Sequence, residues 1–167
     1  MEHVFIREKY LNKVKPYIGK NIIKILSGQR RVGKTTLLKQ IIDLIKLEDK
    51  DANTIYINKE LNEFKNVKSA EDLYQYVQSK LVKSKTNYAL IDEVQEIEDF
   101  EIALRQLLVE GLDLYCTGSN ARMLSGDLAT HLSGRYIEFQ INCLSYSEFL
   151  LFHNLQNTND SLNKYIR

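Results

Sequence analysis

The amino-acid sequence predicts an α/β fold, in which a parallel sheet of five strands is covered by helices on both faces. Short runs of apolar and β-branched residues alternate along the chain with longer segments whose apolar residues recur at helical spacing. The first of these runs leads through a glycine-containing loop directly into a long helical segment. Strands joined through helices run parallel, with right-handed crossovers. The pattern therefore predicts three layers, with a ligand site at the carboxyl ends of the strands.

The predicted strands are short, and polar residues or glycine bound them. β-branched and aromatic side chains favour this assignment, because they pack well on a pleated surface. We expect strands at residues 22–26, 54–57, 88–91, 112–117 and 136–141.

The predicted helices lie between these strands and at both ends of the chain. They cover residues 10–18, 36–42, 73–81, 100–108, 121–132 and 145–152. Pro16 is expected to kink or end the first helix, and Gly111 to close the fourth in a left-handed conformation. Residues 154–161 are polar and turn-like, and a further helix is expected to begin after them. Two capping boxes are expected, at Ser69 with Asp72 and at Ser145 with Glu148.

The composition is that of an ordinary globular domain. The 167 residues carry a net charge of +1, so no overall field attracts nucleic acid or a membrane surface. The only cysteines, Cys116 and Cys143, are widely separated and indicate neither a zinc site nor a disulfide framework. We expect a cytoplasmic protein without a membrane span. The predicted organisation is a helical segment at residues 1–20, a core at 21–153 and a linker at 154–167.

The strongest motif is a phosphate-binding loop. Residues 28–35 match the pattern G-x-x-x-x-G-K-[ST] of a Walker A element, between a predicted strand and a predicted helix. The glycines let backbone N–H groups approach phosphate oxygens, and the helix dipole favours the negative charge. Lys34 adds a positive charge, and Thr35 offers a hydroxyl to Mg²⁺. A strand-to-helix turn without a ligand is the alternative. The expected contacts are Gly28, Gln29, Arg30, Arg31, Val32, Gly33, Lys34, Thr35 and Thr36.

A second motif ends in two adjacent acids. Residues 88–93 form an apolar strand that finishes in Asp92 and Glu93, as a Walker B element does. Two carboxylates at the end of a buried strand are costly unless a ligand needs them. We expect Asp92 to hold Mg²⁺ and Glu93 to orient or deprotonate an attacking water. A strand that runs into an ordinary polar loop is the alternative. Both motifs together predict a P-loop NTPase sandwich.

Four stretches together resemble a family of prokaryotic AAA-type ATPases. They are Gly-Gln-Arg-Arg-Val-Gly-Lys-Thr-Thr-Leu-Leu from Gly28, Ile-Asp-Glu-Val-Gln from Ile91, Thr-Gly-Ser-Asn from Thr117, and Leu-Ser-Gly-Arg-Tyr from Leu132, followed by Leu-Ser-Tyr-Ser-Glu-Phe from Leu144. In that family an ATPase domain precedes a C-terminal domain for which a restriction-endonuclease-like fold has been proposed. The resemblance implies that this chain holds the ATPase domain alone, and that its strands follow the order 5-1-4-3-2.

The resemblance also implies further catalytic residues beside Lys34 and Glu93. Asn120, or its neighbour Ser119, matches the sensor 1 position that contacts the γ-phosphate or the attacking water; the alternative is a helix N-cap. Arg135 matches a Gly-Arg position and would act as an arginine finger, usually at a neighbouring subunit's site; the alternative is a surface or paired arginine. Arg122 is a weaker candidate for that role. Asn58 fits either a polar switch for the glutamate or a turn residue.

These expectations lead to one principal function and two alternatives. The principal one is an ATP-binding, Mg²⁺-dependent ATPase, because the guanine-reading motif Asn-Lys-x-Asp is broken at Leu61. A nucleotide-dependent switch module with negligible turnover is the first alternative. A small-molecule kinase is the second, although no acceptor site is evident. The expected partners are ATP, and either further copies of the chain or a C-terminal domain that completes the site; nucleic acid is not indicated.

Overall fold

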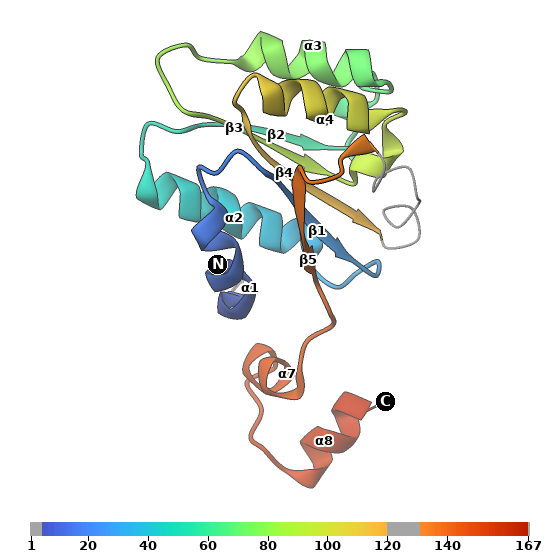
Figure 1. The fold of residues 1–167 in the computed structure, drawn as a ribbon. Helices are drawn as coiled ribbons and strands as arrows, with labels where there is room; N and C mark the ends of the chain where they lie inside the picture. The colour runs from blue at the N-terminus through green and yellow to red at the C-terminus, as the bar shows by residue number, and fades with distance from the viewer. Residues whose placement is uncertain (1–4, 120–130, 167) are drawn as a thin grey trace.

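The computed structural model describes residues 5–119 and 131–166 (Figure 1). The N-terminal half contains α1 (Glu8–Val14), η1 (Lys15–Tyr17), β1 (Ile23–Gly28), α2 (Lys34–Glu48), β2 (Asn53–Asn58), η2 (Asn62–Phe64) and α3 (Ala70–Lys80). The C-terminal half contains β3 (Asn87–Asp92), η3 (Val94–Glu96), α4 (Phe100–Val109), β4 (Asp113–Ser119), β5 (Tyr136–Gln140), α7 (Tyr146–Phe152) and α8 (Asn159–Ile166). Each of the five predicted strands is present.

The five strands form one parallel sheet in the order β2-β3-β4-β1-β5. This is the predicted order, read from the opposite edge. Strand β1 lies between β4 and β5, in register from Ile23 beside Tyr136 to Ser27 beside Gln140. Every residue of β1 is buried, including Lys24, whose ammonium group pairs with Asp113 on β4.

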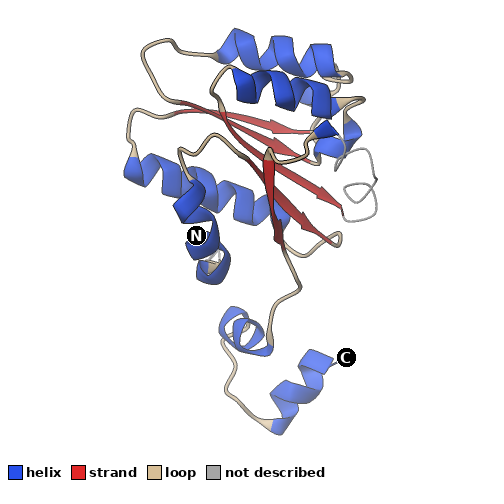
Figure 2. Ribbon diagram, in the orientation of Figure 1, coloured by secondary structure: helices blue, strands red, loops and turns tan. Residues whose placement is uncertain are grey.

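Helices cover both faces of the sheet, as the alternation of elements predicts (Figure 2). Successive strand residues point to opposite faces. Ile25 therefore packs in the core beneath α3 and α4, whereas Leu26 packs in the core that includes α1 and α2. The carboxyl ends of the strands meet at one edge, where β1 turns into α2 (Figure 1).

Most predicted helix boundaries agree with the structure to within a few residues, but α2 continues to Glu48, six residues beyond its predicted end. The helical turn changes to a 3-10 helix at Lys15–Tyr17, where Pro16 lies, and Gly111 has a positive φ of 87° after α4. Both capping boxes are formed. The helix predicted over 121–132 falls almost entirely outside the described residues.

One local prediction was partly wrong. The polar stretch 154–161 is not a turn throughout, because α8 already begins at Asn159. The backbone N–H of Ser161 donates to Thr158 Oγ1 at 3.2 Å, as it would to an N-cap, and Leu162 N–H donates to Thr158 O at 3.0 Å. The polar residues here start a helix and do not prevent one.

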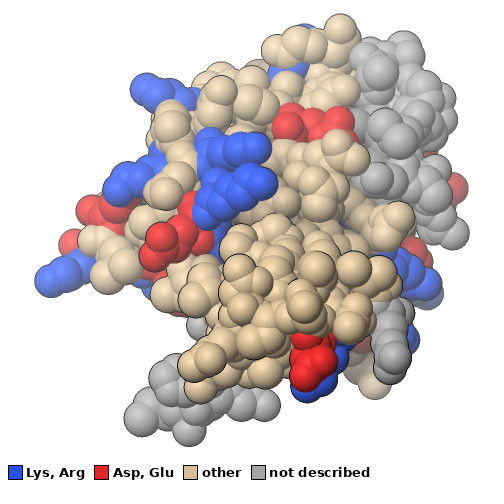
Figure 3. Space-filling view, turned by 90° about the horizontal axis from the view of Figure 1, so that it is seen from below, with Lys and Arg blue, Asp and Glu red and all other residues tan. Residues whose placement is uncertain are grey.

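Helices α7 and α8 lie below the sheet and pack against each other (Figure 1). Tyr165 contacts both Tyr146 and Phe149, with ring centroids 5.4 Å apart in each pair. No residue of α7 is buried, and Leu151 and Phe152 are exposed. Seen from below, the surface of this region carries few charged side chains (Figure 3). The predicted division at residues 153 and 154 stays a prediction.

Among the described residues, no helix is long and apolar enough to cross a membrane.

Candidate functional site

The phosphate loop adopts a conformation that depends on its two glycines. Gly33 has a φ of 91° and is the N-cap of α2, so the loop turns directly into the helix. Gly28 has a φ of 155°, and a Cβ built there would lie 2.3 Å from the carbonyl oxygen of Ile141. No side chain fits at that position. The loop is therefore held tightly between β1 and the segment that follows β5.

Lys34 lies within this loop, with its ammonium group turned back toward the backbone. Its side chain is buried, and Nζ donates to the carbonyl oxygens of Gly28 at 3.1 Å and Gln29 at 2.9 Å. The same Nζ lies 3.8 Å from Glu93 Oε1. The first and second motifs thus meet, as the sequence predicts.

The acids at the end of β3 are supported by hydroxyl groups. The fully buried Asp92 accepts hydrogen bonds from Thr117 Oγ1 on β4 and, at 3.2 Å, from Tyr56 Oη on β2. Burial, together with the neighbouring Asp92, raises the pKa of Tyr56, so the phenol keeps its proton. Thr117 Oγ1 also accepts from the backbone N–H of Glu93 at 2.9 Å. One threonine therefore positions both acids.

Glu93 has an unusual backbone conformation. Its φ and ψ are 56° and 51°, in the left-handed region that non-glycine residues rarely occupy. Such a residue costs about 1–3 kcal/mol, and residues of this kind cluster at functional sites. Its side chain accepts a hydrogen bond from Gln95 Nε2. The carboxylate is consequently held at the mouth of the site beside Lys34.

A cavity of about 570 Å³ joins these elements. Its lining is strongly polar, and most of it comes from the loop and from the turns after β2 and β3. The lining residues are Arg30, Arg31, Gly33, Lys34, Thr35, Glu60 and Glu93. Cations and backbone donors on one side face carboxylates on the other, which suits a phosphate-bearing ligand with a divalent cation.

The residues at this cavity fit Mg²⁺ bound together with phosphate. Thr35 lines the cavity, and Asp92 lies at the carboxyl end of β3, next to Glu93. Within residues 5–119 and 131–166, no group of three or more His, Cys, Asp or Glu side chains could hold a metal ion. Mg²⁺ needs no such group, since it binds through one or two protein oxygens, phosphates and waters.

The other predicted site residues have different outcomes. Ser119 is the last residue of β4, at the edge where the loop lies. Asn120 and Arg122 lie outside the described residues. Asn58 behaves as a turn residue, because its Oδ1 accepts from the backbone N–H of Glu60 at 2.9 Å.

Arg135 lies at the opposite edge of the sheet. It is exposed and precedes β5, and its carbonyl oxygen accepts from the N–H of Ile23 at the start of β1, at 2.9 Å. Gly28 stands at the far end of β1, about 17 Å along the strand at a rise of about 3.3 Å per residue. The structure does not bring Arg135 to the loop of its own chain. A role at a neighbouring subunit's site stays a prediction.

Sequence reasoning missed three residues that the structure brings to this site. Tyr56 and Thr117 reach Asp92 from the two strands that flank β3, and Glu60 lines the cavity. A hint of the role of Thr117 was present in the sequence, since this residue begins the polar stretch that follows an apolar strand. Nothing in the sequence indicated the role of Tyr56, because aromatic residues are common inside strands.

Comparisons with known proteins agree with this architecture. A protein from Haemophilus influenzae is 40% identical over 161 residues, and one from Methanocaldococcus jannaschii is 34% identical over 134. Both are described only as uncharacterized. The alignments cover 95% and 80% of this chain but 40% and 29% of those proteins, so the chain spans well under half of their length.

Solved structures of much lower sequence identity share the fold. A Saccharomyces cerevisiae Hsp104–ADP complex matches with a TM-score of 0.68 and 18% identity, over 90% of this chain and 24% of that one. The Aeropyrum pernix ORC1 protein, solved in complex with DNA, matches with a TM-score of 0.65 and 10% identity, over 98% of this chain and 52% of that one. The family model described as AAA domain matches residues 20–150. The chain therefore belongs to the AAA domain family.

Proposed function

We propose that this domain binds ATP together with Mg²⁺ and hydrolyses it. One observation carries the proposal: the phosphate loop and Glu93 face the same cavity, with Lys34 Nζ 3.8 Å from Glu93 Oε1. A carboxylate beside the loop lysine can act on a water at the γ-phosphate. Membership of the AAA domain family supports nucleotide binding.

The residues of the loop bind the phosphates. Backbone N–H groups of residues 28–36 donate to phosphate oxygens, and the N-terminus of α2 favours their negative charge. Lys34, which contacts the carbonyl groups of Gly28 and Gln29, turns to the β- and γ-phosphates. Thr35 and Asp92 would hold Mg²⁺, which would supply positive charge beside the phosphates.

Glu93 orients the attacking water and accepts its proton. Its backbone is held by Thr117, so the carboxylate cannot move far from the cavity. Asn120 is proposed as the sensor that contacts the γ-phosphate or the water. Arg135 is proposed as a finger that acts on the site of a second copy, since it lies far from its own.

The first experiment is isothermal titration with ATP and with GTP in the presence of Mg²⁺. We expect binding that prefers ATP, lost in Lys34→Ala and retained in the control Lys39→Ala, an exposed lysine on the same helix. Glu93→Gln should still bind ATP but lose turnover, whereas the control Glu98→Gln should keep both. Binding without any turnover in the wild type would favour the nucleotide-switch alternative. No binding at all would reject the proposal.

A mixing experiment tests the role of Arg135. Lys34→Ala cannot bind phosphate but keeps Arg135, while Arg135→Ala keeps the loop but lacks the finger. If Arg135 acts between subunits, the two inactive variants regain part of the ATPase activity when mixed. A mixture that stays inactive, when wild-type chains are active, would contradict a role in trans. Arg105→Ala, at an exposed position on α4, is the control.

A further inference from the structure

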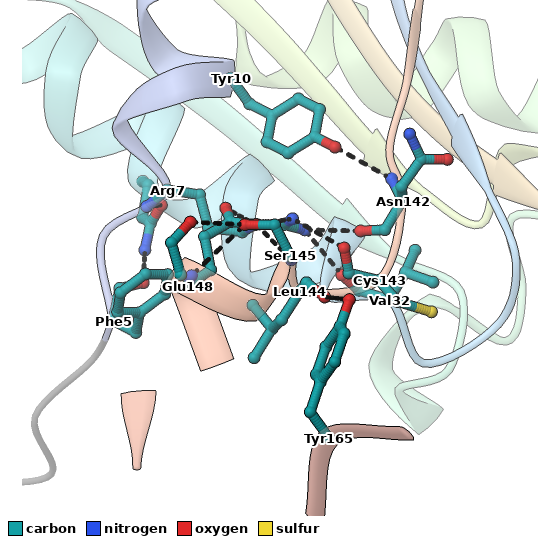
Figure 4. Close-up of polar contacts among 12 residues, drawn as sticks. Phe5, Arg7, Tyr10, Val32, Asn142, Cys143, Leu144, Ser145, Glu148 and Tyr165 are labelled. Carbon is teal, nitrogen blue, oxygen red and sulfur yellow. Dashed lines mark hydrogen bonds and ion pairs between the residues drawn. The ribbon is translucent and has the colours of Figure 1, made fainter. Parts of the chain in front are cut away.

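A buried arginine outside both motifs contacts the phosphate loop. Arg7 precedes α1, and its side chain is only 4% exposed (Figure 4). Its Nη1 donates to the carbonyl oxygen of Val32 in the loop at 3.0 Å, and to that of Asn142 after β5 at 3.0 Å. Nη2 donates to the carbonyl oxygen of Cys143 at 3.5 Å. One guanidinium group thus joins segments that lie 25 and 136 residues away in the sequence.

The backbone of Arg7 is anchored separately. Its N–H donates to Gln40 Oε1 on α2 at 3.2 Å, and Gln40 Nε2 donates back to the carbonyl oxygen of Phe5 at 2.8 Å. The guanidinium lies over the ring of Tyr10, 4.5 Å from its centroid. Arg7 therefore approaches the loop from a position that α1 and α2 define.

The contact with Val32 bears on phosphate binding through the geometry of the peptide bond. In a trans peptide, the carbonyl group and the following N–H point in opposite directions. Arg7 holds the carbonyl of Val32 on the outer side of the loop. The N–H of Gly33, which lines the cavity, is thereby directed to the inner side. A guanidinium that keeps this peptide from rotating keeps one phosphate donor in place.

The same guanidinium is paired with Glu148 on α7. Arg7 Nε lies 3.2 Å from Glu148 Oε1, and Nη2 lies 3.3 Å from Oε2. Glu148 also accepts from the N–H of Ser145 at 2.8 Å, so it caps its own helix. Burial raises the pKa of this carboxyl, but hydrogen bonds from Arg7 and Ser145 outweigh burial and hold the pKa below its ordinary value.

In the part of the chain that the structure describes, helix α7 has few other attachments to the body of the domain. None of its residues 146–152 is buried. Phe152 meets the ring of Phe5 edge-on at 6.1 Å, and Tyr165 of α8 donates to the carbonyl oxygen of Leu144 at 3.0 Å. Within residues 5–119 and 131–166, the ion pair between Arg7 and Glu148 gives α7 a polar connection to the loop (Figure 4).

We propose that Arg7 is a positioning residue for the phosphate loop, and that Glu148 makes its action depend on where α7 lies. When α7 is in place, Glu148 orients the guanidinium toward Val32, and the Gly33 amide faces the phosphates. When α7 moves away, Arg7 loses its partner and the loop loses its support. Nucleotide affinity and the position of α7 are then linked, and the linkage is reciprocal.

The proposal requires an arginine at this position. A planar guanidinium has five N–H donors and can serve three carbonyl groups and both oxygens of a carboxylate at the same time, whereas an ammonium group has only three donors. Lysine keeps the charge and can reach Glu148 but cannot make the whole set of contacts. Arg7→Lys is therefore the informative variant, and Arg7→Ala adds a loss of packing on Tyr10.

The test uses Arg7→Lys, Glu148→Gln and the double variant, at a temperature where circular dichroism shows each to be folded. Asp113→Asn is the matched control, since it also changes a carboxylate to an amide in a buried ion pair, with Lys24 at the other edge of the sheet. We measure ATP affinity with Mg²⁺, and amide hydrogen exchange of residues 30–35 without nucleotide.

We expect Arg7→Lys to weaken ATP affinity about tenfold and Glu148→Gln about threefold, because charge-assisted hydrogen bonds to the loop are lost or misdirected. Exchange at residues 30–35 should rise in both variants and stay unchanged in Asp113→Asn. The double variant should bind no more weakly than Arg7→Lys, since both changes act through one guanidinium.

Two results would overturn the inference. The first is unchanged exchange at residues 30–35 in folded Arg7→Lys and Glu148→Gln. The second is a double variant whose loss of affinity equals the product of the two single losses. The affinity measurement rests on the proposed function, but the exchange measurement does not. If the wild type binds no ATP, the proposed function fails, while exchange still decides the role of Arg7.

Discussion

Gly28 is the position where the structure makes its sharpest prediction about stability. Gly28→Ala would place a Cβ 2.3 Å from the carbonyl oxygen of Ile141, more than 1 Å inside the ordinary contact distance of 3.4 Å. The neighbour is backbone, so it cannot rotate away. The segment after β5 must move, and this strains or breaks the hydrogen bond from Ile141 N–H to Ser27 O, now 2.7 Å.

The expected magnitude follows from two contributions. A non-glycine residue at this φ costs about 1–3 kcal/mol, and an unpaired buried backbone group costs about 1–3 kcal/mol. We expect the free energy of unfolding to fall by about 2–6 kcal/mol, a large part of a typical total of about 5–15 kcal/mol. The phosphate loop begins at this residue, so ATP affinity should fall as well.

Urea denaturation followed by circular dichroism measures the effect. Gly111→Ala is the matched control, because Gly111 also has a positive φ but a Cβ there meets nothing within 4 Å. In that variant the free energy of unfolding should fall only by the cost of backbone strain, about 1–2 kcal/mol. If Gly28→Ala is no less stable than Gly111→Ala, the close approach of Ile141 does not matter and the reasoning is refuted.

Three further predictions concern groups around the site. Thr117→Val removes the hydroxyl that bridges the two acids, and should cost about 1–3 kcal/mol of unfolding free energy and lower ATP turnover; unchanged turnover would count against its positioning role. The lowered pKa of Glu148 means that its pair with Arg7 stabilises the fold above the ordinary pKa of 4.5, a contribution lost as pH falls through the lower folded value. Between about pH 5 and 3, urea denaturation should therefore show wild type losing more stability than Glu148→Gln. Glu8 and Lys9 line the same surface cavity as Glu148 and are unchanged in both proteins; equal losses of stability in the two proteins would contradict this role of Glu148. Native protein should react with one equivalent of a thiol reagent, at the exposed Cys143, since burial raises the pKa of Cys116 to about 12; fast reaction of two equivalents would show that the core opens.

Local patterns predicted the site because its central chemistry is local. The phosphate loop lies within eight consecutive residues, and the pair Asp92 and Glu93 directly ends a strand. Capping boxes span four residues, so Ser69 and Ser145 could also be recognised as helix starts.

The parts that the sequence did not predict depend on contacts between distant segments. Thr117 reaches Asp92 across 25 residues, and Arg7 reaches Glu148 across 141. No spacing rule links such pairs, because they become neighbours only after the strands are ordered. The early start of α8 was missed for a different reason: the residues that favour turns also favour helix N-caps.

The sequence by itself determined the fold class, and its motifs marked the loop at residues 28–35 and the two acids that end β3. These follow from backbone preferences, burial and the chemistry of adjacent side chains. Only the tertiary structure decided that Arg135 lies at the edge opposite its own loop, and that a buried arginine near the N-terminus connects this loop to α7. Both results depend on how parallel strands bring distant residues together. Local patterns in the sequence do not show which distant residues become neighbours.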